Sequence, residues 1–418
     1  MNKLDRKIPA FSGFSIEIDE RYFMAQNKKL FRLGIKLNTP NICNWSCPYC
    51  YVGDEKSKLR PQKLDDQGNV THDLSKDPFW FERMKGWILQ GIELGAKAVT
   101  LNGTFEPTTS KDLYNVIDFC RSENLATTLV TNGLLLKDDD IERLYKSGVN
   151  VLTKLNVPIA DSTDPNYDRF CDIQKELSGL KSEKTKIYEN QKELIQKFID
   201  IGFNEKQTDG STRFGVESVI TNLNLEFMPK LIRQLRNLNI YAHIEVTKLQ
   251  GFAKANPNLT ISKEKLQWLF ETVRDEDYAD GFNYYDIKPP YIGGTCYENL
   301  HRLDIHADGN VKPCPGIETN IGNLNKISLA EVLNSQSLDI IRNLEKYIEG
   351  DCKECDLFKS RECYGGCRGT VYQTLKSNGF SEYESWVGSD PSCWRVENLL
   401  DKKIAKTTLF NKTAATVQ

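Results

Sequence analysis

The chain has 418 residues, of which 39% are hydrophobic and 27% charged, and its formal net charge is -3. This charge argues against a nucleic-acid partner held by charge alone, and no apolar run reaches the roughly 18 residues that span a bilayer. The first twenty residues turn acidic before any apolar stretch forms and so do not read as a signal peptide; we expect a cytoplasmic protein without a membrane partner.

Strand-like and amphipathic helix-like segments alternate along the first two thirds of the chain. Strands are predicted at residues 31–37, 97–101, 125–130, 149–157, 213–220 and 240–246. Helices are predicted at residues 79–94, 111–124, 138–147, 187–201, 225–238 and 262–274, where apolar residues recur with helical spacing. Six βα units in series predict an α/β fold with a parallel sheet, a partial (βα)6 TIM-like barrel whose chemistry lies at the carboxyl ends of the strands.

Two polar segments interrupt this rhythm, at residues 55–77 and 160–186. Both follow predicted strands, so we expect both to be loops on the catalytic face, either binding substrate or merely solvated. Lys288-Pro289-Pro290 and Gly293-Gly294 then mark a boundary before a cysteine-rich stretch with short strands and one helix near residues 329–347. We therefore expect an N-terminal extension (1–30), a barrel core (31–284), a small cysteine-rich α+β domain (285–400) and a C-terminal tail (401–418).

The twelve cysteines are strongly clustered, which in a reducing compartment is typical of metal ligands rather than disulfides. Cys43, Cys47 and Cys50 follow the first predicted strand with the spacing CxxxCxxC. A structural zinc site needs four ligands, whereas three thiolates suit three irons of a 4Fe–4S cube and leave the fourth iron open. Three buried structural cysteines are the alternative, but the loop between them is too polar for an apolar core.

This CxxxCxxC motif, with Tyr49 before its third cysteine, resembles that of the radical S-adenosylmethionine superfamily. The resemblance spans roughly residues 30–280 in architecture. It implies that the open iron chelates S-adenosylmethionine, whose reductive cleavage yields a 5′-deoxyadenosyl radical that takes a hydrogen atom from substrate. Residues 101–107 (LNGTFEP) resemble the family's GGEP segment, with Thr104-Phe105 replacing the second glycine. By this resemblance the cofactor-binding residues are Tyr49, Gly103, Glu106, Asn156, Glu217 and Thr221, with Asn222 as a further candidate.

Seven later cysteines resemble the SPASM domain that follows many radical S-adenosylmethionine cores, although one internal gap is seven residues rather than five. The resemblance implies one auxiliary 4Fe–4S cluster held by Cys352, Cys355, Cys363 and Cys393. A second auxiliary cluster would be held by Cys296, Cys314 and Cys367, with either an open iron or a non-cysteine ligand drawn from His301, Asp304 and His306. For His306 we favour a plain turn. A zinc knuckle built from Cys352, Cys355, Cys363 and Cys367 is the alternative.

Two cysteines stand apart from these groups. Cys120 lies among apolar residues and is predicted to be core. Cys171 lies in the predicted loop at the catalytic end and is a candidate catalytic hydrogen-atom donor to a substrate radical.

The domain pairing favours oxidative modification of a peptide or protein side chain, fed by an electron donor such as flavodoxin or ferredoxin. One alternative is dehydrogenation, epimerisation or decarboxylation of a sugar or aminocyclitol. Another is a zinc-binding protein without catalysis.

Overall fold

The computed structural model describes residues 6–14, 16–39, 43–51, 76–103, 105–180, 186–282, 295–317 and 319–397. Within them one open sheet has the strand order β6-β5-β4-β3-β2-β1-β7-β8-β9. The first six strands are parallel and are β1 (Arg32–Leu37), β2 (Ala98–Gly103), β3 (Ala126–Val130), β4 (Asn150–Lys154), β5 (Phe214–Ile220) and β6 (Tyr241–Val246). The six predicted strands and the α/β class are confirmed, and β6 does not pair with β1, so the barrel is partial.

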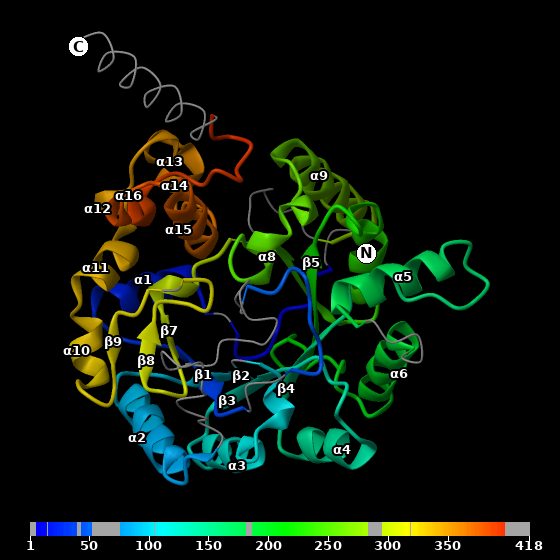
Figure 1. The fold of residues 1–418 in the computed structure, drawn as a ribbon, viewed down its shortest axis with the longest axis horizontal. Coiled ribbons are helices and arrows are strands. Elements are labelled where there is room, and N and C mark those ends of the chain that lie inside the picture. The colour runs from blue at the N-terminus through cyan, green and yellow to red at the C-terminus, as the bar shows by residue number, and fades with distance from the viewer. Residues whose placement is uncertain are drawn as a thin grey trace, which may run out of the picture.

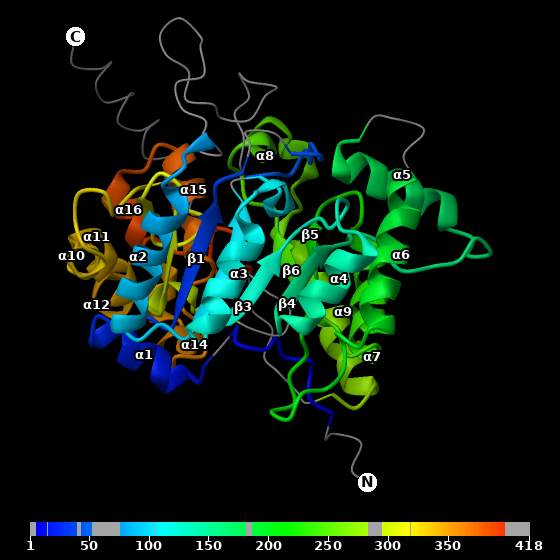
Figure 2. The same cartoon turned by 90° about the horizontal axis from the view of Figure 1, so that it is seen from below.

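Helices cover the outer side of this sheet (Figures 1 and 2). They are α2 (Trp80–Glu93), α3 (Leu113–Ser122), α4 (Asp138–Lys146), α6 (Ile187–Asp200), α7 (Met228–Asn237) and α9 (Lys263–Ala279), each close to a predicted range. Ser262 starts α9 by accepting a hydrogen bond from the Lys265 backbone N–H. Shorter elements are α1 (Ile18–Gln26), α8 (Phe252–Ala255) and single 3-10 turns at Pro107–Thr109, Leu225–Phe227, Pro257–Leu259 and Glu298–Leu300.

The strand register gives the sheet two chemically different faces. Leu33 and Ile35 of β1 pair with Val99 and Leu101 of β2, and these four buried side chains face the helices. The alternate positions point into the barrel, and many of them are polar or charged, including Lys36, Asn102, Lys154, Glu217 and His243. A polar inner wall inside an apolar shell is suited to binding a polar ligand rather than to closing a core.

The cysteine-rich segment extends the barrel sheet. Strand β7 (Arg302–Ile305) pairs in parallel with β1, and β8 (Asn310–Lys312) and β9 (Gly322–Asn323) follow antiparallel. Short helices then gather beyond this edge of the sheet (Figure 1): α10 (Leu329–Leu333), α11 (Gln336–Arg342), α12 (Leu344–Tyr347), α13 (Asp351–Glu354), α14 (Asp356–Lys359), α15 (Arg368–Ser377) and α16 (Glu382–Val387). The domain limits drawn above stay a prediction.

Two sequence-based predictions are wrong. Residues 160–186 are not one loop, because α5 (Tyr167–Ser178) occupies much of them; Phe170, Ile173 and Leu177 form a buried stripe at helical spacing. The single helix near 329–347 is three helices, because the backbone leaves the helical conformation at Ser335 (φ -66°, ψ 143°) and again at Asn343 (φ -113°, ψ 37°). The polar segment at 55–75, the Pro and Gly pairs at 288–294, and the tail at 401–418 lie outside the described residues. Among those described, no helix is long and apolar enough to cross a membrane.

Candidate active site

The CxxxCxxC loop is fixed by two neighbouring elements at the carboxyl end of the barrel. The Ser46 N–H donates to the carbonyl of Ser178 at the end of α5 (2.9 Å), and the Ala253 N–H donates to the carbonyl of Cys50 (3.3 Å). Gly179 follows α5 with φ +69°, and a Cβ there would lie 2.0 Å from the Ser46 carbonyl oxygen. A residue without a side chain is therefore required where α5 meets the cysteine loop.

The three thiols of this loop interact with one another. Burial and, after it, the neighbouring thiols of Cys50 and Cys43 raise the pKa of Cys47 to about 12, against the effect of the Lys154 ammonium. A buried thiol whose pKa is raised, as that of Cys47 is, is held as a thiolate when a metal binds it. The donor set therefore fits an iron–sulfur cluster.

Glu106, expected to bind the cofactor, already accepts hydrogen bonds on both carboxylate oxygens. Its Oε1 accepts from the Thr108 N–H (3.1 Å), the Thr108 hydroxyl (2.7 Å) and the Thr131 hydroxyl, and its Oε2 accepts from the Asn132 N–H (2.9 Å). Glu106 thereby fixes the turn after β3, whose Asn132 side chain reaches Cys43 Sγ at 3.9 Å. Gly103 ends β2 and Thr104 lies outside the described residues. The cofactor role of Glu106 stays a prediction.

The other expected cofactor contacts divide into two groups. Asn156 Nδ2 donates to the Tyr49 hydroxyl (3.3 Å), so the structure brings these two buried residues together beneath the cysteine loop. Thr221 is fully buried and its hydroxyl donates to Asn224 Oδ1 (2.9 Å), which is a local loop contact. Asn222 likewise donates to the Asn258 carbonyl (2.9 Å). Their contacts with the cofactor stay a prediction.

A cavity of about 1070 Å³, partly open to solvent, occupies the inside of the barrel. Tyr51, next to Cys50, lines it on one side, and Cys296, Cys314 and Cys367 line it on another. Glu217 also lines it, as an inward residue of β5 that pairs with Lys154 (2.8 Å). One cavity therefore connects the first cysteine loop with three cysteines that lie more than 240 residues later in the sequence.

One charged group of side chains on the cavity wall was missed by sequence reasoning. Glu245 Oε2 accepts from the Lys248 ammonium (2.6 Å), and Glu245 Oε1 accepts from His243 Nε2 (3.1 Å). Burial opposes the charge of Glu245, but Lys248 and His243 outweigh it and hold the pKa of the carboxyl well below its usual range. The signal was present in the sequence, since polar Tyr241, His243 and Glu245 alternate with Ala242 and Ile244 at the strand period.

The cysteines predicted for one auxiliary cluster gather at this cavity. A hydrogen bond from the Cys296 thiol lowers the pKa of Cys367 to about 5, with help from Lys248 and Thr370 and against the effect of burial. Of the three predicted non-cysteine ligands, none lines the cavity wall. Asp304 accepts from Arg302 (2.9 Å), and His301 is fully buried with its ring beside Phe31.

His306 begins the turn that joins β7 to β8, as predicted. Its N–H donates to the Asn310 carbonyl (2.8 Å), and Gly309 takes the positive φ of +83° that the turn requires. The prediction that His306 is a turn residue is confirmed.

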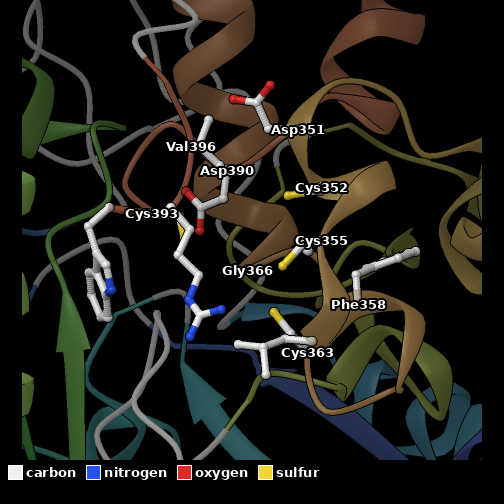
Figure 3. A pocket seen from close by; sticks show the side chains of 13 residues that line it. Asp351, Cys352, Cys355, Phe358, Cys363, Gly366, Asp390, Cys393 and Val396 are labelled. Atoms are coloured by element: carbon white, nitrogen blue, oxygen red, sulfur yellow. The ribbon is translucent and has the colours of Figure 1, made fainter.

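The cysteines predicted for the other auxiliary cluster line a second, smaller pocket. Figure 3 shows the side chains of Cys352, Cys355, Cys363 and Cys393 facing this pocket. Cys367 instead lines the barrel cavity, so the four ligands of the zinc-knuckle alternative are split between two sites.

The turn between the third and fourth of these ligand positions, Cys363 and Cys367, explains the division. Gly365 and Gly366 both have positive φ, and a Cβ on Gly366 would lie 1.8 Å from the Asp390 carboxylate. The two glycines turn the chain sharply enough for Cys363 and Cys367 to face different cavities.

The two lone cysteines lie away from both cavities. Cys120 is fully buried in the core, as predicted. Cys171 is on helix α5 rather than in a loop, where its thiol lies 3.6 Å from Glu189 Oε1, and burial with this carboxylate raises its pKa to about 11. Its position gives no support to hydrogen-atom donation in the barrel cavity, and that role remains untested.

Comparison with known proteins identifies two families along this chain. Residues 37–217 match the radical SAM superfamily, and residues 296–356 match SPASM, an iron–sulfur cluster-binding domain. The PqqA peptide cyclase of Gluconobacter oxydans is 22% identical over 390 residues, covering 88% of this chain and 94% of its own length. A tungsten-containing aldehyde ferredoxin oxidoreductase cofactor-modifying protein of Pyrococcus furiosus is 23% identical over 343 residues (77% and 86%).

Among solved structures, Streptococcus suis SuiB bound to the precursor peptide SuiA superposes with a TM-score of 0.58. The sequences are 18% identical, and the match covers 90% of this chain and 79% of SuiB. This likeness shows a shared fold.

Proposed function

Because this chain belongs to the radical S-adenosylmethionine superfamily and carries a SPASM domain, we propose that it oxidises a side chain of a peptide or protein substrate inside its barrel cavity. It is an enzyme that uses 4Fe–4S clusters and S-adenosylmethionine, which supply a 5′-deoxyadenosyl radical and one-electron transfer when bound. The zinc-binding alternative is set aside, since the family match and the divided cysteine set both oppose it.

The single observation that carries this proposal is the cavity shared by Tyr51 and the trio Cys296, Cys314 and Cys367. A substrate bound there would lie between the first cysteine loop, where the radical is generated, and a second cysteine site. A substrate carbon that loses a hydrogen atom must still lose an electron to become oxidised. A metal site on the same cavity wall is a suitable acceptor for that electron.

We assign the cysteines to clusters as follows. Cys43, Cys47 and Cys50 would hold the cluster that binds S-adenosylmethionine, with Tyr49 and Asn156 supporting its loop. Two auxiliary clusters would be held by the cysteines of the two cavities. Electrons would enter from a one-electron protein donor of the flavodoxin or ferredoxin class.

A peptide substrate is favoured by two relatives. One is a peptide cyclase by name, and SuiB has been seen with a precursor peptide bound. Small polar metabolites are the second candidate. The inner wall of the cavity is charged, and Phe14 and Arg21 line the cavity at the amino ends of the strands. Such a cavity would suit a compact polar ligand.

The test is anaerobic turnover of the reconstituted full chain with S-adenosylmethionine and a reductant. Peptides and polar metabolites encoded or made by neighbouring genes are supplied as substrates and analysed by mass spectrometry. We expect a peptide to lose two hydrogen atoms, one of them recovered in 5′-deoxyadenosine. A metabolite oxidised in place of every peptide would favour the second candidate, and solvent deuterium at the reacting carbon would indicate epimerisation instead.

A further inference from the structure

Three polar side chains of β6 form a continuous hydrogen-bonded row along the cavity wall. Tyr241, His243 and Glu245 occupy alternate positions of the strand, so all three point into the barrel, and all three line the cavity. The Tyr241 hydroxyl is 3.2 Å from His243 Nδ1, and His243 Nε2 is 3.1 Å from Glu245 Oε1. Lys248 holds the other Glu245 oxygen at 2.6 Å. The row runs from the catalytic end of the strand toward its amino end.

The contacts of Glu245 fix the tautomer of His243. An ionised carboxylate can only accept hydrogen bonds, so the His243 nitrogen facing it, Nε2, must carry a hydrogen. In the neutral ring Nδ1 then has a free electron pair and accepts from the Tyr241 hydroxyl. A carboxylate that orients an imidazole so that its second nitrogen can take a proton is the arrangement used for general-base catalysis.

Building on the proposed oxidation, we propose that His243 is the proton acceptor of the reaction and that it receives the substrate proton through the Tyr241 hydroxyl. Glu245 is the positioning residue that holds the imidazole, and Lys248 holds Glu245. The row thus supplies the general base of the site and also forms part of the cavity wall.

The proton balance of an oxidation explains why such a base is needed. Conversion of H–C–X–H to C=X, where X is oxygen or nitrogen, removes one hydrogen atom from carbon and then one proton and one electron. The hydrogen atom and the electron go to the bound cofactors. For the proton, the X–H bond breaks while Tyr241 Oη gains a hydrogen, and the former Tyr241 O–H hydrogen moves to His243 Nδ1. The X–H bonding electrons stay on the substrate, where one of them joins the radical electron in the new π bond and the other is the electron lost.

Other ionisable side chains on the described cavity wall are less suited to this step. Three carboxylates line the wall, and each is in an ion pair that protonation would break: Glu217 with Lys154, Glu245 with Lys248, and Glu298 with Arg302. Arg21 and Arg302 are cations and cannot accept a proton. The cysteines of the cavity are assigned to a cluster. His243 is thus the side chain of this wall best placed to accept a proton without losing an ion pair to lysine or arginine.

Turnover of matched variants tests the proposal. His243→Gln and Tyr241→Phe are each expected to lower product formation about 100-fold while leaving 5′-deoxyadenosine formation within about twofold of wild type, because the proton leaves only after S-adenosylmethionine is cleaved. His306→Gln, in the β7–β8 turn, is the control and should match wild type in both.

Three results would overturn it: product formation by His243→Gln within threefold of wild type, a folded His243→Gln that no longer cleaves S-adenosylmethionine, or an unaffected Tyr241→Phe. Should far-UV circular dichroism show that His243→Gln is unfolded, Tyr241→Phe, which loses a single oxygen atom, decides the question.

A second measurement needs no substrate and separates this inference from the proposed function. The chain has only 4 histidines, so 15N-histidine labelling of the full chain gives few NMR signals, and those of His243 are the ones missing from His243→Gln. We expect the proton of the neutral ring on Nε2, with a mixed tautomer in Glu245→Gln. A proton on Nδ1 in the wild type would refute the geometry. A correct tautomer with no peptide or metabolite oxidised would count against the proposed function alone.

Discussion

Substitution of Gly179 by alanine tests how the fold holds the radical-generating loop. Gly179 has φ +69°, and its new Cβ would lie 2.0 Å from the carbonyl oxygen of Ser46, which is backbone and cannot rotate away. The left-handed conformation costs about 1–2 kcal/mol for alanine. Relief of the contact requires a backbone shift of roughly 1 Å, which costs about 1–3 kcal/mol by analogy with overpacked cores. The same shift would break the Ser46–Ser178 hydrogen bond, which contributes about 1 kcal/mol.

Gly148 provides a matched control for this substitution. It follows α4 with φ +76°, and an added Cβ would meet nothing within 4 Å. Gly148→Ala should therefore cost only the conformational part, about 1–2 kcal/mol, whereas Gly179→Ala should cost about 3–6 kcal/mol when the parts are combined. The difference isolates the contact between α5 and the cysteine loop.

The assay for these two variants combines chemical denaturation with 5′-deoxyadenosine formation. Gly179→Ala should unfold at lower denaturant and, because its strain falls on the loop of Cys43, Cys47 and Cys50, should also cleave S-adenosylmethionine more slowly. Gly148→Ala should keep the wild-type cleavage rate. Equal losses of stability and activity in the two variants would refute the reasoning, since they would show that the Ser46 contact does not constrain the loop.

Three further predictions concern the core and the cysteines. Asp277→Ala should destabilise the chain by about 3–5 kcal/mol, because it leaves the buried Arg236 guanidinium, 2.5 Å from Asp277, without its ion pair. Thermal unfolding measures this loss against Asp138→Ala, which removes an exposed ion pair with Lys197. Equal unfolding midpoints of the two variants would contradict the prediction. Cys393→Ala and Cys367→Ala should each lower the iron content from about twelve toward about eight iron atoms per chain. Loss of both auxiliary clusters in either single variant would count against the assignment of one cluster to each cavity. Cys171→Ala should leave product formation unchanged if its place on α5 keeps it from the substrate, whereas product loss with intact 5′-deoxyadenosine formation would restore the hydrogen-donor role.

The barrel could be predicted from sequence because its signals are local. Each of the first six strands is a short apolar or alternating run, and each is followed by a helix with its own apolar stripe. The clustered cysteines were equally visible, because their spacing is itself the motif. The missed helix α5 carries the same kind of stripe, but it is flanked by polar residues that made the whole segment read as loop.

What could not be predicted depends on contacts between distant parts of the chain. The pairing of β7 with β1 joins four-residue stretches some 270 positions apart, and no local pattern specifies it. The same pairing brings Cys296 and Cys314 to the barrel cavity. The inward polar side chains of β6 could be placed at the site only from the strand register, which sets His243 of β6 beside Glu217 of the neighbouring strand β5.

The most direct test of the central claim is the formation of 5′-deoxyadenosine by the reconstituted chain under anaerobic conditions with S-adenosylmethionine and a reductant. Wild type and a Cys120→Ala control should both form it, while a variant with Cys43, Cys47 and Cys50 all replaced by alanine should form none. Continued cleavage by that triple variant would contradict the assignment of these three thiolates as the radical-generating site.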